Sequence, residues 1–119
     1  MPPNKDNPFV LNNKPVRHEL ETPLGSLIVY IKPLSWIEQQ DALSRFVSIK
    51  TVDGEMTPKM DLGGYWRYVL MNCITSTEPK LSKEDLFNLH PDVGNALKRL
   101  LPDLTDIIQS FSEGFDPLG

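Results

Sequence analysis

The chain has 119 residues, of which 39% are hydrophobic and 24% are charged. This composition is typical of one globular domain and excludes a fibrous or wholly disordered chain. Twelve basic against 16 acidic side chains give a formal net charge of −4. Because phosphate backbones are bound by clustered lysine and arginine, this balance argues against nucleic acid as a partner.

Cysteine usage and the N-terminal residues indicate a cytoplasmic protein. Cys73 is the only cysteine, so an intramolecular disulfide and a cysteine-based zinc cage are both excluded. Residues 1–8 have neither the apolar core of a signal peptide nor the arginine-rich pattern of a transit peptide. The apolar runs are far shorter than the roughly 20 residues of a membrane-spanning helix. We therefore expect no membrane association.

Proline positions divide the chain into three parts. Four of the 11 prolines fall within the first 15 residues, where no apolar periodicity is present. We expect a flexible N-terminal arm over residues 1–13, a single α+β domain over residues 14–113 and a short tail over residues 114–119.

A β-hairpin is predicted near the start of the domain. Residues 16–21 alternate between apolar and polar side chains, and residues 22–25 have the composition of a turn. Residues 27–32 are apolar on both faces, as in a strand that other elements cover. Because a two-stranded ribbon is only marginally stable alone, helices are expected to pack on it.

Capping patterns and helical periodicity predict about five short helices. Ser35 and Glu38 have the spacing of a capping box, Ser82 begins a similar pattern, and Pro91 suits a first helical turn. Residues 50–60 form a turn-rich link compatible with a small hairpin. The expected apolar stripes are Trp36, Leu43, Phe46 and Val47; Trp66, Val69, Leu70, Cys73 and Ile74; Leu86 and Leu89; Val93, Leu97, Leu100 and Leu101; and Leu104, Ile107, Ile108 and Phe111. The predicted fold class is α+β and mainly α, with the hairpin followed by these helices.

The residues that could carry catalysis have simpler structural interpretations. Cys73 lies on the apolar stripe of the clearest helix, where desolvation keeps a thiol neutral. His90 precedes a proline at a helix junction, and His18 lies on the apolar face of a strand. Neither histidine has an acidic partner at a spacing that suits a metal. We expect no catalytic residues, no cofactor and no metal, and hence no enzyme.

Aromatic side chains at two places are candidates for binding a partner protein. Tyr65 and Tyr68 flank the Trp66 stripe, either as edge residues of the core or as part of an interface. Phe111 and Phe115 lie near the C-terminus, where a small core offers least. Part of the last stripe, together with Phe115, is expected to contact another protomer or a client helix. The alternative is that the stripe simply closes the core.

The order of these features resembles a known family. The segments that carry the resemblance are PLGSLIVYIKPLSWIEQQDALSRF, GGYWRYVLMNCITSTEPKLSKEDLFNL and ALKRLLPDLTDIIQSF. Over roughly residues 16–113 they look like the small tail assembly chaperones of long-tailed bacteriophages, although the proline-rich arm has no counterpart there. The resemblance implies a mainly helical protein that coats the tape-measure protein, helps to recruit tail-tube subunits and self-associates in the host cell cytoplasm.

The first functional hypothesis is therefore a non-enzymatic bacteriophage tail assembly chaperone. It would bind the tape-measure protein and tail-tube subunits through apolar helical faces during tail morphogenesis. The alternatives are a structural virion or baseplate-type tail component that uses a hairpin edge for strand addition, and a generic protein–protein interaction domain.

Overall fold

The computed structural model describes the backbone of residues 7–114 and the side chains of residues 7–109. Within this part of the chain, helices and strands alternate irregularly. Their order is β1 (Val16–Thr22), β2 (Gly25–Ile31), α1 (Trp36–Phe46), β3 (Val47–Val52), β4 (Glu55–Met60), α2 (Leu62–Cys73), β5 (Ile74–Glu78), α3 (Lys83–Phe87), α4 (Pro91–Lys98) and α5 (Leu104–Gly114).

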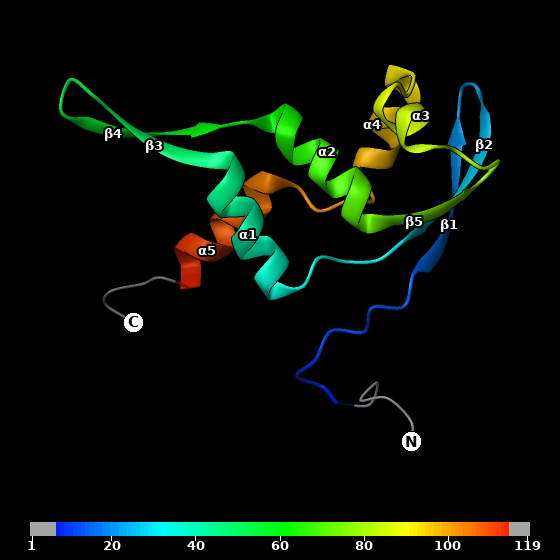
Figure 1. Cartoon of the computed structure of the whole chain (residues 1–119), viewed down its shortest axis with the longest axis horizontal. Coiled ribbons are helices and arrows are strands. Elements are labelled where there is room, and N and C mark those ends of the chain that lie inside the picture. Colours follow the sequence, from blue (N-terminus) through cyan, green and yellow to red (C-terminus); the bar gives the residue numbers. More distant parts are fainter. Residues whose placement is uncertain (1–6, 115–119) are drawn as a thin grey trace.

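The two sheets lie at opposite ends of the molecule. Figure 1 shows β1, β2 and β5 at one end, the ribbon of β3 and β4 projecting at the other, and the helices between them. The radius of gyration is 16.9 Å, against about 13 Å for a compact chain of this length. The projecting ribbon and residues 7–15, which run away from the helices in Figure 1, contribute to this expansion. No helix in the described part of the chain is both long and apolar enough to cross a membrane.

The three-stranded sheet has the strand order β1-β2-β5 and is antiparallel throughout. The register of the first pair runs from Val16 opposite Ile31 to Thr22 opposite Gly25. Gly25 has a φ of +126°, which only glycine adopts without strain, so the tight turn depends on it. The hairpin therefore lies where the alternation of residues 16–21 predicts it.

Local capping residues determine where the helices begin. The Ser35 hydroxyl accepts from the Glu38 amide at 3.2 Å, and the Ser35 amide donates to the Glu38 carboxylate at 2.9 Å. Ser82 and Asp85 form the same reciprocal pair at α3. Pro91 occupies the first turn of α4. The predicted capping sites are thus confirmed.

The core is centred on α2. Tyr65, Val69 and Cys73 of this helix are all 0% exposed. The α2 N-terminus lies close to the end of α1. A Cβ added to Gly64 would be only 2.9 Å from the Phe46 ring, so this close approach requires glycine. The other buried apolar residues are Leu20, Leu27, Val29, Ile31, Leu34, Ala42, Ile74, Leu86, Leu97, Leu101, Leu104 and Ile107.

The expectation of a mainly α fold is wrong. Residues 47–60 form a complete second hairpin, and residues 74–78 form a third strand of the main sheet. Val47 and Ile74, which the helical pattern assigned to helices, are instead the first residues of β3 and β5. Both are β-branched, and the strand partners that receive them favour the extended conformation over a further helical turn. The fold is α+β with substantial strand content.

The predicted apolar stripe of α1 is wrong at its first residue. Trp36 is 72% exposed, whereas Ala42 is fully buried on the face that meets the core. Leu43, Phe46 and Val47 are partly buried against that core. A small residue at Ala42 permits close helix packing, whereas Trp36, the first residue of α1, is exposed although it lies on nearly the same side of the helix as Leu43.

The burial of two nearby leucines makes the core assignment testable. Leu97 is 1% exposed and Leu100 is 36% exposed. We expect Leu97→Ala to lower the free energy of unfolding by about 2–5 kcal/mol, because the cavity would be enclosed. The matched control Leu100→Ala should cost less than half as much. Leu100 follows the end of α4 at Lys98. Urea denaturation measures both changes, and equal losses would contradict the difference in burial between the two leucines.

Candidate functional site

Tyr65 is a structural residue of the core. Its hydroxyl donates to the carbonyl oxygen of Pro102 at 2.6 Å, which joins α2 to the segment between α4 and α5. Burial raises the pKa of the Tyr65 hydroxyl, and electrostatic interactions with Cys73 and Asp103 act in the same direction. A side chain that is 0% exposed offers no surface to a partner in this conformation.

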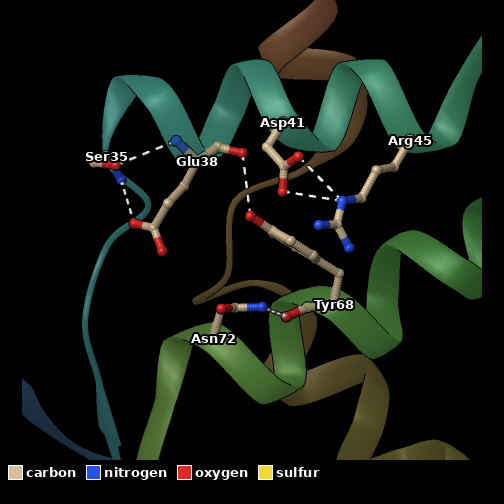
Figure 2. A network of polar contacts seen from close by, with 6 residues as sticks. All are labelled: Ser35, Glu38, Asp41, Arg45, Tyr68 and Asn72. Atoms are coloured by element: carbon tan, nitrogen blue, oxygen red, sulfur yellow. Dashed lines mark hydrogen bonds and ion pairs between the residues drawn. The ribbon is translucent and has the colours of Figure 1, made fainter.

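Tyr68, one helical turn away, lies at the contact between α1 and α2. Its hydroxyl donates to the carbonyl oxygen of Glu38 at 3.3 Å, and its ring meets the Phe46 ring edge-on at 5.6 Å. Desolvation raises the pKa of the Tyr68 hydroxyl, with a further contribution from the Asp41 carboxylate. Figure 2 shows Tyr68 between the two helices.

The polar side chains around Tyr68 interact with one another. Arg45 binds Asp41 through contacts of 3.1 Å, and its guanidinium lies 5.9 Å from the centre of the Tyr68 ring. On the α2 side, the Asn72 amide donates to the Tyr68 carbonyl at 2.7 Å (Figure 2). The Asp41–Arg45 and Asn72–Tyr68 contacts each lie within one helix, whereas the Tyr68 hydroxyl and the Arg45 guanidinium join the two helices. Tyr68 is half-buried, so a partner could contact only part of its ring.

Cys73 and the two histidines have structural surroundings. Cys73 is buried, as predicted, and burial raises the pKa of its thiol to about 11. His90 accepts from the Asp92 amide at 3.1 Å and caps α4. His18 lies on β1 and is partly buried. In the part of the chain that the structure describes, no cluster of three metal-ligating side chains is present.

The structure does not describe the side chains of the two C-terminal candidates, Phe111 and Phe115. Phe111 belongs to α5, but its side chain lies outside the described residues, as does all of Phe115. Leu104 and Ile107 of the same helix are 0% and 5% exposed, so they close the core. Ile108 is partly buried beside them and faces the ribbon side of α1.

The ribbon of β3 and β4 has one apolar and one polar face. Cross-strand pairing places Val47 with Met60, Ile49 with Pro58, and Thr51 with Met56. Because side chains alternate along a strand, these three pairs share one face. The other face has the pairs Ser48 with Lys59, Lys50 with Thr57, and Val52 with Glu55.

The apolar face of the ribbon is open to solvent. Ile49 is 63% exposed and Met56 is 71% exposed. Sequence reasoning did not single out these residues, although the alternation on either side of Asp53-Gly54 carried the signal. Exposed apolar groups of this kind, gathered on one face, are typical of surfaces that bind another protein.

This face continues into a groove at the base of the ribbon. The groove has a volume of about 560 Å³. It is lined by Gln40, Leu43 and Ser44 of α1, by Val47, Ile49, Met56 and Pro58 of the ribbon, and by Ile108 of α5. The lining has no charged side chain, so the groove can accept apolar side chains of another protein without desolvating a charge. We call it the ribbon groove.

A second exposed apolar cluster lies beside the N-terminus of α1. It contains Phe9, Val10, Leu11, Trp36 and Ile37, and Phe9 is 93% exposed. Residues 7–15 belong to no helix or strand. This cluster therefore lacks the regular walls of the ribbon groove, which is the better-defined site.

No protein-family model, curated protein or solved structure matches this chain.

The two tyrosine hydrogen bonds differ enough to be separated by mutation. Tyr65→Phe should lower the free energy of unfolding by about 1–2 kcal/mol, because the Pro102 carbonyl loses a short bond in a buried place. Tyr68→Phe removes a longer and more exposed bond and should cost less. Thermal or urea denaturation provides the comparison, and a larger loss for Tyr68→Phe would contradict it.

The raised pKa of Cys73 predicts a pH dependence of stability. The unfolded thiol ionises near 9.0 and the folded thiol near 11. The stability that the neutral thiol contributes is therefore present below about pH 9 and lost as the pH rises towards 11. We expect the difference in unfolding free energy between wild type and Cys73→Ala to shrink over this range. A constant difference from pH 7 to 10.5 would show that the thiol is not desolvated.

Proposed function

We propose that this chain is a non-enzymatic tail assembly chaperone of a long-tailed bacteriophage and that its ribbon groove holds an amphipathic helix of the tape-measure protein. The observation that carries the proposal is the exposed apolar face of β3–β4, which continues onto α1 and α5. The resemblance of residues 16–113 to the tail assembly chaperones supplies the identity of the client.

The dimensions of the ribbon suit one helix. Each strand has six residues, which corresponds to a length of about 20 Å. An α-helix of about 13 residues has the same length, and its diameter of about 10 Å matches the width of two strands with their side chains. Residues at i, i+3, i+4 and i+7 of such a helix would point towards the groove, as in other helix-in-groove complexes.

The chemistry of the lining suits a client of variable sequence. Gln40 and Ser44 are its only polar residues, so binding depends mainly on apolar contact. Met56 has a flexible, polarizable side chain that adapts to differently shaped partners. A protein that coats a long tape-measure helix must accept many different apolar stripes, and this lining favours such tolerance.

The polar residues near the groove support binding over catalysis. Glu38 caps α1, Asp41 pairs with Arg45, and the Tyr68 hydroxyl donates to a backbone carbonyl. Glu38 and Asp41 stabilise α1, which supplies part of the groove lining, and the Tyr68 hydroxyl joins α1 to α2. All three groups have a structural role that supports the groove.

The proposal distinguishes an assembly factor from a permanent tail component. A chaperone leaves its client when the tail-tube subunits assemble, whereas a baseplate-type protein stays in the particle. Mass spectrometry of purified particles should therefore detect tape-measure protein without this chain. If this chain were present in the particles at stoichiometric levels, that result would contradict the chaperone role and favour the structural alternative.

Met56→Ser tests the groove directly. Met56 belongs to the apolar face, and removing its side chain should reduce the soluble yield of a co-expressed tape-measure helix. It should also weaken binding of that helix as a purified peptide by about tenfold, which corresponds to about 1.4 kcal/mol. Thermal denaturation should change little, because Met56 is 71% exposed.

Val52→Ser is the matched control. Val52 belongs to the same ribbon and is 56% exposed, but it lies on the polar face opposite Glu55. Peptide affinity and client solubility should stay at the wild-type level. Equal loss in both variants, or loss in neither, would contradict binding at the apolar face.

A further inference from the structure

The backbone of β3 presents an unpaired outer edge. The ribbon consists of β3 and β4 alone within the described chain, so each strand has a partner on one side only. The turn at Asp53 and Gly54, with φ values of 53° and 83°, makes Val52 and Glu55 the closing hydrogen-bonded pair. Residue pairs along β3 and β4 then alternate between hydrogen-bonded and non-hydrogen-bonded, starting from the hydrogen-bonded pair at the turn. The amides of Ile49 and Thr51 consequently point away from β4.

Two observations at the base of the ribbon agree with this alternation. The Asp61 amide donates to the Phe46 carbonyl at 2.8 Å. Phe46 therefore continues the series of residues in β3, every second one, that hydrogen-bond to the opposite strand. The Val47 amide donates to the Leu43 carbonyl of α1, so it points away from β4. The orientation of the β3 edge is therefore anchored at both ends.

The two outer edges of the ribbon are not equivalent. Pro58 is opposite Ile49 in β4 and has no N–H group. Its ring lies at the outer edge of β4, where proline obstructs the addition of another strand. The outer edge of β3 contains no proline, and its amides at Ile49 and Thr51 are available to a further strand.

We propose that this edge pairs with β3 of a second copy of the chain, antiparallel about a two-fold axis, with Ile49 opposite Ile49 of the second copy. The charge of Lys50 selects this register. The register with Ile49 opposite Ile49 places Lys50 opposite Ser48 of the second copy on the polar face. A register with Ile49 opposite Thr51 would place the two Lys50 side chains directly opposite each other, which is destabilising.

The remaining nearby register is excluded by the length of the strand. Placing Ile49 opposite Val47 of the second copy would place Thr51 opposite Arg45, which belongs to α1 and not to β3. The Ile49 register keeps Val47, Ile49 and Thr51 within the paired segment. In it, each Ile49 amide donates to the opposite Ile49 carbonyl, and each Thr51 amide donates to the opposite Val47 carbonyl.

The pairing has two structural consequences. The two ribbons become one four-stranded sheet, which is more stable than two isolated hairpins. Their apolar faces lie on the same side and merge into one surface of about twice the width. Because a strand edge of about 20 Å buries far less than the roughly 800 Å² per partner of a standard interface, association is reversible and depends on concentration.

Charge substitutions at Ser48 test the register. Ser48→Glu places a carboxylate opposite Lys50 of the second copy twice per dimer, and Ser48→Lys places an ammonium there. We expect the first to lower the dimer dissociation constant by about two- to thirtyfold and the second to raise it by a similar factor. Sedimentation velocity over a range of protein concentrations measures both.

Thr57→Glu and Thr57→Lys are the matched controls. Thr57 is opposite Lys50 within the same ribbon and shares its polar face, but it lies on β4. These variants change net charge and ribbon stability in the same way, without placing a charge across the proposed edge. They should leave the dissociation constant within about twofold of wild type. Equal effects at both positions, or Ser48 variants indistinguishable from wild type, would overturn the proposal.

Amide hydrogen exchange of the wild-type protein tests the same edge without mutation. Raising the protein concentration should slow exchange at Ile49 and Thr51, while the outward-pointing Met56 amide on β4 stays unchanged. Protection at Met56 with none at Ile49 would assign the association to the other edge and overturn the proposal. A monomer at every concentration would also overturn it, while leaving peptide binding to the ribbon groove as a separate measurement.

Discussion

The junction between α1 and β3 determines where the candidate site lies. The helix ends at Phe46 and the strand begins at Val47, with no loop between them. The Phe46 ring packs edge-on against Tyr65 and Tyr68. The Phe46 backbone carbonyl accepts from the amide of Asp61, which directly follows β4. Asp61 also caps α2 by accepting from the Gly64 amide at 2.9 Å. The base of the ribbon is thus held by the helix pair, and its far end projects into solvent.

This arrangement separates stability from recognition. The interactions that hold α1, α2 and α5 together are buried apolar contacts and a few backbone-directed hydrogen bonds, such as that from Tyr65 to Pro102. The surface proposed for binding contributes little to that core, because Ile49 and Met56 are mostly exposed. Substitutions on the ribbon can therefore change binding without unfolding the domain, which makes the groove experimentally accessible.

The ribbon also explains why a small protein keeps an apolar face uncovered. A two-stranded ribbon gains little stability by itself, and a client helix on its face or a second copy at its edge would each supply missing contacts. The two modes use different parts of the same element. The face of the sheet receives side chains, whereas the β3 edge receives backbone hydrogen bonds, so both can operate together.

The sequence alone determined the features that depend on neighbouring residues: the capping boxes at Ser35 and Ser82, the first hairpin and the burial of Cys73. Only the tertiary structure decided which helix faces are buried and which short apolar segments become strands. The second helix is apolar nearly all round, so its periodicity permitted Trp66 as readily as Tyr65 on the inner face. Strand β5 pairs with residues more than forty positions earlier, and such a distant partner leaves no local periodicity to detect. Long-range pairing and the choice between similar faces depend on which surfaces meet in three dimensions, because burial energy follows contact and not sequence order.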